Sequence, residues 1–237
     1  SGLAPEQWKG KKTERTAMSF KKVIFPFIKF KTKPMQDFLD ECLKTTIYRV
    51  NKDAFSKEVK IGNVTYTVAT GGLHSQDNPV ELWSSGRELF PSSTGGQYDV
   101  LNDDDYVYIH ADINSMYPSI IAAHKVAPAH LDTNAFCNLI GGLKNKRVEV
   151  KHSDEDTVDG IDRDTLALVL KIVINSVYGK LGFENGNLYD RLAVLKTTIN
   201  GQLMMLMLVE ELELHNIHVL SANTDGIVIK LYKRDID

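Results

Sequence analysis

Short runs of alternating or continuous apolar residues predict several strands. The clearest is residues 106–113, which are rich in β-branched and aromatic side chains and predict a buried strand. Near the C-terminus two alternating segments flank Thr224-Asp225-Gly226, which predicts a hairpin because Asp-Gly suits a tight turn. The further strands predicted by pattern are 47–51, 63–70, 218–223 and 227–232.

Apolar residues at helical spacing predict the longer elements. Pro34 opens an amphipathic helix over 35–45, and Pro118 suits the first position of another that ends near Lys125. We expect residues 1–22 to be partly disordered and residues 86–105 to form a loop. The remaining predicted helices cover 132–140, a segment carrying Lys144, Arg147 and Lys151, a segment from Asp162 or Asp164 to Gly179, and 193–214.

Asp112 stands at the end of the predicted strand 106–113. Tyr117, which precedes a proline, is expected to be extended, so the chain should run from strand through a tight turn into a helix. The free N–H groups of such a turn can hold phosphate beside a carboxylate that can hold a metal ion. An ordinary turn with a solvated aspartate would show the same pattern.

Composition bounds the class of protein. The chain has 237 residues, of which 43% are hydrophobic and 25% charged, as in a globular protein with one large or two small domains. We find no apolar run that approaches a membrane span and no apolar core of a signal peptide at the N-terminus. Cys42 and Cys137 suggest neither a disulfide framework nor a zinc site and fit a reducing cytoplasm.

Charge is unevenly distributed along the chain. The net charge is only −3, yet residues 1–33 carry nine Lys and Arg against two acids. This basic arm could follow a nucleic-acid backbone, or it could be a solvated linker. The run Asp103-Asp104-Asp105 is interpreted as a solvated turn rather than a metal site.

Two predicted helices carry polar stripes. Lys171, Asn175 and Tyr178 have i, i+4, i+7 spacing and share one face, which packing alone does not require, although a snorkelling lysine explains part of it. Arg147 and Lys151 are also four residues apart. A solvated basic face explains that pair equally well, and Lys144 and Lys146 compete for the same role.

Three motifs resemble those of family B DNA polymerases. Asp112-x-x-Ser-Met-Tyr-Pro-Ser-Ile-Ile is similar to motif A, with Met116 in place of the usual Leu. Lys-x-x-x-Asn-Ser-x-Tyr-Gly at 171–179 is similar to motif B. The hairpin at 222–226 stands in the place of motif C, usually Asp-Thr-Asp-Ser, with Asn223 replacing the first acid and Gly226 the serine. The Gly-Gly-Leu-His segment at 71–74 resembles a template-contacting segment of phage and plasmid members.

The resemblance implies template-directed DNA synthesis, in which two Mg²⁺ ions, replaceable by Mn²⁺, transfer a nucleotide from dNTP to a primer 3′-hydroxyl. Asp112 and Asp225 would be catalytic and would hold metal together with the carbonyl of Ile113. Asn223 could coordinate through its carbonyl while lowering the charge of the site; the role of Thr224 is open. The residues implied in nucleotide binding are Ser115, Met116, Tyr117, Arg147, Lys151, Lys171 and Asn175. Those implied in DNA binding are Gly71, Gly72, Tyr178 and Gly179.

The same resemblance implies an α+β fold: an antiparallel palm sheet with helices packed on one face, plus a short helical fingers insertion. We expect a basic arm at 1–33, palm at 34–121 and 186–237, and fingers at 122–185. No Asp-x-Glu exonuclease motif precedes the palm, and no thumb follows Asp225. The chain is therefore interpreted as a palm and fingers fragment of a phage- or plasmid-like replication enzyme.

Other functions are weighed against this one. A catalytically weak palm that binds primer–template DNA and dNTP as a module is the main alternative, because Asn223 departs from motif C. Motifs A and B disfavour a reverse transcriptase or nucleotide cyclase. A nuclease is disfavoured because the only acidic residues that form a recognisable motif are those of the palm. We expect the protein to act in the cytoplasm of a bacterium or of a phage-infected host cell, without a membrane partner. Whether it binds replication accessory proteins or a terminal protein is left open.

Overall fold

The computed structural model describes residues 11–49, 51, 54–76 and 106–235. The predicted loop at 86–105, with its three aspartates, lies outside these residues. The chain divides into two compact units, each built from three segments. The helical unit comprises residues 1–18, 46–50 and 115–198, and the sheet unit comprises residues 19–45, 51–114 and 199–237. The domain boundaries expected from the sequence stay a prediction.

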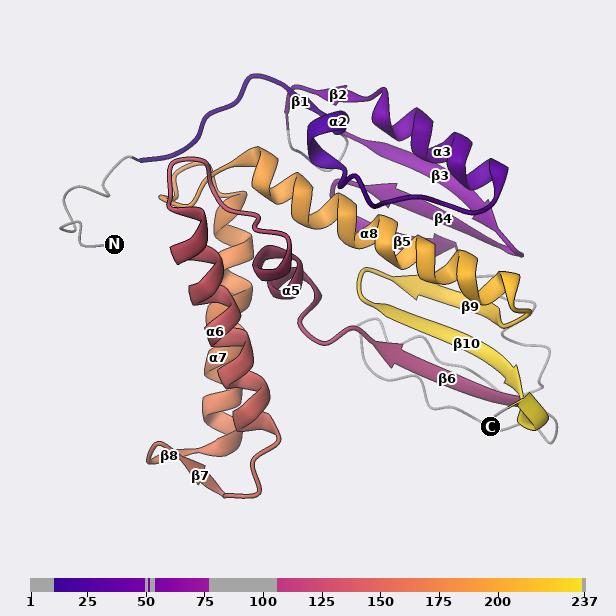
Figure 1. The fold of residues 1–237 in the computed structure, drawn as a ribbon. Coiled ribbons are helices and arrows are strands. Elements are labelled where there is room, and N and C mark those ends of the chain that lie inside the picture. The colour runs from indigo at the N-terminus through magenta and orange to yellow at the C-terminus, as the bar shows by residue number, and fades with distance from the viewer. Residues whose placement is uncertain (1–10, 50, 52–53, 77–105, 236–237) are drawn as a thin grey trace. The chain divides into compact units, whose positions relative to one another are not determined.

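A six-stranded antiparallel sheet forms the centre of the sheet unit, in the order β3-β4-β5-β9-β10-β6 (Figure 1). Its strands are β3 (Ser56–Ile61), β4 (Val64–Ala69), β5 (Gly72–Gln76), β6 (Tyr106–Asp112), β9 (His218–Asn223) and β10 (Gly226–Tyr232). In β4 every second side chain is buried, which matches its alternation of Val and Tyr with Thr. The predicted hairpin and the predicted strand 106–113 are confirmed.

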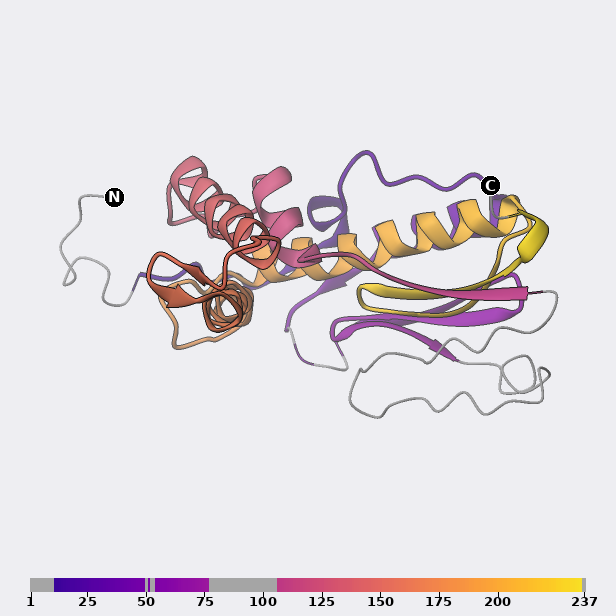
Figure 2. The same cartoon turned by 90° about the horizontal axis from the view of Figure 1, so that it is seen from below.

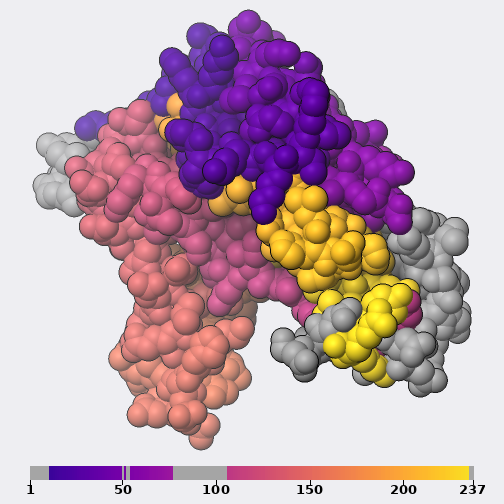
Figure 3. All heavy atoms as spheres, turned by 45° about the vertical axis from the view of Figure 1, so that its right-hand side comes forward, coloured from indigo at the N-terminus to yellow at the C-terminus, as the bar shows by residue number. Residues whose placement is uncertain are grey.

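Helices cover one face of this sheet, which confirms the predicted fold class. Figure 2 shows the C-terminal part of α8 (Arg191–Leu214) above the strands, and α3 (Lys33–Leu43) belongs to the same unit. In Figure 3 the residues coloured indigo and purple gather against the orange end of α8. The buried carboxylate of Glu210 makes this contact, because it accepts hydrogen bonds from the backbone N–H groups of Lys31 and Thr32 at 2.9 Å each. The short helix α2 (Phe20–Val23) precedes this segment.

Helix α8 corrects one expectation about membranes. By length and composition it is apolar enough to cross a bilayer, although the sequence pattern was expected to contain no such run. However, 72% of its most apolar 18-residue segment is buried inside the structure, as is typical of a helix in a hydrophobic core. Its buried polar side chains are bonded: Asn200 and Gln202 contact backbone groups of other segments, and the Thr197 and Thr198 hydroxyls donate to carbonyls four residues earlier.

The helical unit contains α5 (Met116–Ala123), α6 (Thr133–Lys151), α7 (Arg163–Leu181) and the first turns of α8. The side chains of Asp132 and Asp162 cap α6 and α7, each accepting a backbone N–H three residues later. A small hairpin of β7 (Thr157–Val158) and β8 (Ile161–Asp162) joins the two helices. Two further short strands are β1 (Met18–Ser19) and β2 (Thr46–Ile47).

Three local predictions for this unit were wrong. The two helices expected over 132–151 form a single helix, α6, in which Gly141 packs against α5: a Cβ on Gly141 would stand 3.5 Å from Cβ of Ala122, an ordinary contact distance. Tyr117 is helical rather than extended, since α5 already begins at Met116. Residues 11–18, expected to be partly disordered, are held in place; the N–H of Thr13, for example, donates to the carbonyl of Tyr189 at 2.9 Å.

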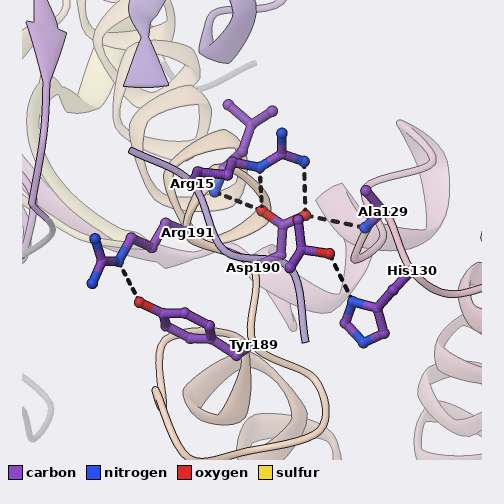
Figure 4. A network of polar contacts seen from close by, with 8 residues as sticks. Arg15, Ala129, His130, Tyr189, Asp190 and Arg191 are labelled. Carbon is purple, nitrogen blue, oxygen red and sulfur yellow. Dashed lines mark hydrogen bonds and ion pairs between the residues drawn. The ribbon is translucent and has the colours of Figure 1, made fainter. Parts of the chain in front are cut away.

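Asp190 anchors that N-terminal segment (Figure 4). Its side chain is 1% exposed and accepts two hydrogen bonds from the guanidinium of Arg15, at 2.8 and 3.0 Å. It also accepts the backbone N–H groups of Ala129 at 3.0 Å and Leu192 at 2.9 Å. Burial alone would raise the pKa of Asp190, but the hydrogen bonds from Arg15 and Ala129 outweigh it and hold that pKa below the ordinary 3.8.

Candidate active site

The hairpin of β9 and β10 brings Asp225 beside Asp112. Gly226 pairs with Asp112 across β10 and β6, and the backbone N–H of Ile113 donates to the carbonyl of Asp225 at 2.8 Å. Both aspartates are exposed, and no basic side chain among the described residues forms an ion pair with the carboxylate of Asp112. Asp112 and Asp225 are therefore neighbours, and in the described part of the chain no lysine, arginine or histidine forms an ion pair with Asp112.

Glycine at position 226 leaves space for this arrangement. A Cβ there would lie 2.9 Å from Oδ1 of Asp112 and 3.2 Å from Nε2 of His110. The serine usual in motif C would therefore crowd Asp112 in this chain. Sequence reasoning overlooked His110, although alternation along β6 places it on the same face of the sheet as Asp112.

The donor set suits a divalent cation that prefers oxygen ligands. Carboxylates and backbone carbonyls are the groups that Mg²⁺ and Mn²⁺ take from proteins, usually with waters and substrate oxygens completing the shell. Asp112, Asp225 and the carbonyl of Ile113 offer such oxygens. Among the residues described, no group of three His, Cys, Asp or Glu side chains could hold an ion by itself. Water or other oxygen ligands would have to complete the shell of an ion held by these residues.

Motif C carries Asn223 and Thr224 at the neighbouring positions. Asn223 is exposed at the end of β9, where it pairs with His74 of β5. The hydroxyl of Thr224 lies 2.9 Å from where a Cβ on Gly72 would stand, and Gly72 has a φ of 140°, which favours glycine. Gly71 meets nothing within 4 Å at its Cβ position. The segment predicted to contact template therefore touches the motif C hairpin.

The part of motif A that belongs to the helical unit starts at Ser115, whose backbone conformation is strained. Ser115, the N-cap of α5, is left-handed with a φ of 54°. Its hydroxyl accepts a hydrogen bond from the guanidinium of Arg147 on α6 at 3.1 Å. The competing Lys146 instead forms ion pairs with Asp159 and Glu149. The structure therefore favours Arg147 over Lys146 as the basic residue at the turn, while Lys144 and Lys151 make no described ion pair.

Motif B lies on α7. Lys171 and Asn175 are exposed, and the ring of Tyr178 packs on that of Tyr117, with centroids 4.5 Å apart. Burial raises the pKa of Tyr178 to about 12, so its hydroxyl stays neutral. A Cβ on Gly179 would meet nothing within 4 Å, so packing in the described chain gives no reason for a glycine there. Met116 is buried beneath the turn, which limits it to backbone contacts with a ligand.

The predicted residues form two groups. Asp112, Ile113, Asn223, Thr224 and Asp225 gather in the sheet unit with Gly71 and Gly72, and the rest lie in the helical unit. That Lys171 faces Asp112 stays a prediction, because the two residues belong to different units.

Residues 130–228 match the family model described as DNA polymerase family B, which confirms the resemblance inferred from the motifs. The chain is 30% identical over 149 residues to a DNA polymerase of Thermococcus sp. (strain 9oN-7), covering 52% of this chain and 19% of that protein. It is also 30% identical over 152 residues to the DNA polymerase alpha catalytic subunit of Oryza sativa subsp. japonica, covering 56% of this chain and 10% of that one.

Among solved structures, the family B DNA polymerase from Pyrobaculum calidifontis is similar, with a TM-score of 0.40 and 20% identity over 53% of this chain and 20% of that one. The chain therefore spans a fifth or less of the length of these relatives. The relatives named here come from archaea and a plant; the phage- or plasmid-like origin expected from the sequence stays a prediction.

Proposed function

We propose that this chain, similar to family B DNA polymerases over residues 130–228, carries the nucleotidyl-transfer site of a DNA-directed DNA polymerase. The observation that supports the proposal best is the register that sets Gly226 opposite Asp112, because it brings Asp225 beside Asp112. Adjacent exposed carboxylates repel one another in the absence of a cation and are suited to share one. The substrates would be dNTP and primer–template DNA.

In this proposal Asp112, Asp225 and the carbonyl of Ile113 would hold the metal ions. Bound there, two divalent ions would activate the primer 3′-hydroxyl and neutralise charge on the triphosphate. The chain's own groups would orient the nucleotide. The backbone N–H groups at Ser115 and Met116 and the guanidinium of Arg147 would face phosphate oxygens, since the hydrogen bond from Arg147 to Ser115 holds that cation at the turn.

The sugar and base would be read by the aromatic pair. Tyr117 and Tyr178 fix one another by ring packing, so the proposal gives Tyr117 the place beneath the sugar, where a 2′-hydroxyl would be crowded. Tyr178 and the open backbone at Gly179 would lie at the nascent base pair. Lys171 and Asn175, on the exposed side of α7, would meet the triphosphate. The isolated chain should add nucleotides poorly or not at all, because no thumb holds the duplex. Single-nucleotide addition to a primed template with Mg²⁺ or Mn²⁺ by the full-length enzyme therefore tests the whole scheme; no addition with either ion would contradict it.

The charge of Lys171 is open to a direct test. Lys171→Ala should raise the KM for dNTP and lower kcat/KM about 10- to 100-fold, because a charge-assisted hydrogen bond to phosphate is lost. Lys180→Ala is the matched control, since nine residues along a helix turn the side chain about 180° to the opposite face. Equal kinetics for both variants would show that Lys171 is only a solvated lysine.

The alternative function is a palm that binds DNA and nucleotide without efficient catalysis, and Asn223 is the residue that favours it. Asn223→Asp restores a second motif C carboxylate and should tighten Mn²⁺ binding about tenfold through its added charge. Asn216→Asp, in the turn that precedes β9, controls for the change in net charge. Titration of Mn²⁺ by electron paramagnetic resonance gives both affinities. If Asn223→Asp raises nucleotide addition from none to a measurable rate, the binding-module function describes the natural chain; unchanged affinity would place Asn223 outside the metal site.

A further inference from the structure

We propose that Gln202 is a positioning residue that locks the Gly-Gly turn, defined as residues 70–72, to the motif C hairpin. The turn and the loop carrying Asp225 then move as one body. The importance of this link for catalysis rests on the proposed function, in which residues 70–72 contact template and the carboxylate of Asp225 holds metal. Its physical basis is a chain of contacts within the sheet unit.

The first contact joins α8 to the end of β4. The Gln202 side chain is fully buried. Its amide nitrogen donates to the carbonyl of Ala69 at 2.8 Å, and its amide oxygen accepts the N–H of the same residue at 2.9 Å. Ala69 is the last residue of β4 and pairs with Gly72 across the turn. One buried amide therefore fixes both backbone groups of the residue from which the turn departs.

The second contact joins the turn to the hairpin. Gly72 lies so close to Thr224 that a Cβ would stand 2.9 Å from its hydroxyl oxygen. The link continues along β5, where the Ser75 hydroxyl is 3.0 Å from that of Ser221 and accepts the N–H of Ala222 at 3.1 Å. A displacement of the turn would therefore be transmitted to Thr224 and to its neighbour Asp225.

Asn200 offers a control of nearly equal chemistry. It is a fully buried amide two residues earlier on α8, and it also braces backbone groups. It accepts the N–H of Phe25 at 2.7 Å and donates to the carbonyl of Val23 at 2.8 Å. Neither residue belongs to the candidate site. If Gln202 only satisfies a polar group in the core, its loss should resemble the loss of Asn200.

Hydrogen–deuterium exchange on the full 237-residue chain separates these cases. In Gln202→Met, the amides of residues 71–76 and 224–226 should both exchange about tenfold faster than global destabilisation explains, whereas in Asn200→Leu they should not. Acceleration confined to residues 71–76 would overturn the coupling, as would equal acceleration in both variants or in neither.

A double-mutant cycle covers the case in which Gln202→Met does not fold. Gly72→Ala should destabilise the chain and speed exchange at 224–226, and Thr224→Ala should relieve part of the cost by removing the contacted hydroxyl. Strictly additive effects would show that turn and hairpin are independent. Failure of the proposed function has a different signature: Mn²⁺ binding would survive Asp225→Asn, while the exchange pattern would be unaffected by that result.

Discussion

Under the proposed function, replacing Asp225 with Asn should weaken Mn²⁺ binding by at least about 100-fold and remove metal-dependent nucleotide addition by the full-length enzyme. The reason is that Asp112 and Asp225 are the paired acids of the sheet unit, and an amide cannot supply the charge of a carboxylate. Asp40→Asn, on the exposed surface of α3, is the control for an identical change elsewhere. Mn²⁺ titration followed by single-nucleotide addition measures both effects.

The free energy of unfolding of Asp225→Asn shows whether a loss of metal binding is a direct effect or a result of unfolding. Asp225 is exposed and the change to Asn keeps the size of the side chain, so Asp225→Asn should alter the free energy of unfolding by no more than about 0.5 kcal/mol. Binding lost together with several kcal/mol of stability would mean instead that Asp225 supports the hairpin. Binding retained would remove Asp225 from the metal site and with it the proposed mechanism.

Asp190→Ala should lower the free energy of unfolding by about 3–5 kcal/mol, the range for removing one partner of a buried ion pair. The change leaves the guanidinium of Arg15 without its carboxylate and the N–H groups of Ala129 and Leu192 without their acceptor. Urea denaturation followed by circular dichroism gives the difference. Glu14→Ala removes the exposed pair with Lys12 in the same segment and should have little effect. A loss below about 1 kcal/mol for Asp190→Ala would show that solvent replaces the network.

The same network predicts a dependence on pH. Because the pKa of Asp190 is lower in the folded chain than the ordinary 3.8, the unfolded chain binds its proton first as pH falls. The contribution of Asp190 to stability is therefore complete above about pH 5 and is lost as pH drops below 3.8 through the folded pKa. Between pH 6 and 3 the Asp190→Ala chain should lose less stability than the natural one. Parallel curves would contradict this origin of acid sensitivity.

Patterns that depend on neighbouring residues were predicted well. The strand ending at Asp112 and the Asp-Gly hairpin follow from β-branched runs and turn chemistry. The cap at Asp162 follows from the preference of short polar side chains for a helix start. These local signals also place Asp112 at a strand end and Asp225 in a hairpin turn, which is why the elements of the candidate site could be expected from the sequence.

What was missed depends on contacts between distant residues. Strand β3 was not predicted, because its Lys-Glu-Val-Lys segment has too few apolar residues to show a buried face. It forms a strand by pairing with β4. The glycines of α6 suggested a break until α5 was seen packed against Gly141. Nothing local marks Gln202 as a brace for Ala69, 133 residues away in sequence. Arg15 and Asp190 were passed over for the same reason.

The division of each unit into three chain segments has a consequence for synthesis on the ribosome. Strands β5 and β6 leave the ribosome well before their partners β9 and β10, which begin at residues 218 and 226. At ordinary translation speeds the wait between β6 and β10 is on the order of ten seconds. Throughout that time two strands of the nascent chain expose unpaired edges and an uncovered apolar face to other proteins. Recombinant yield should therefore depend on holdase chaperones that shield these strands until α8 and the last hairpin emerge.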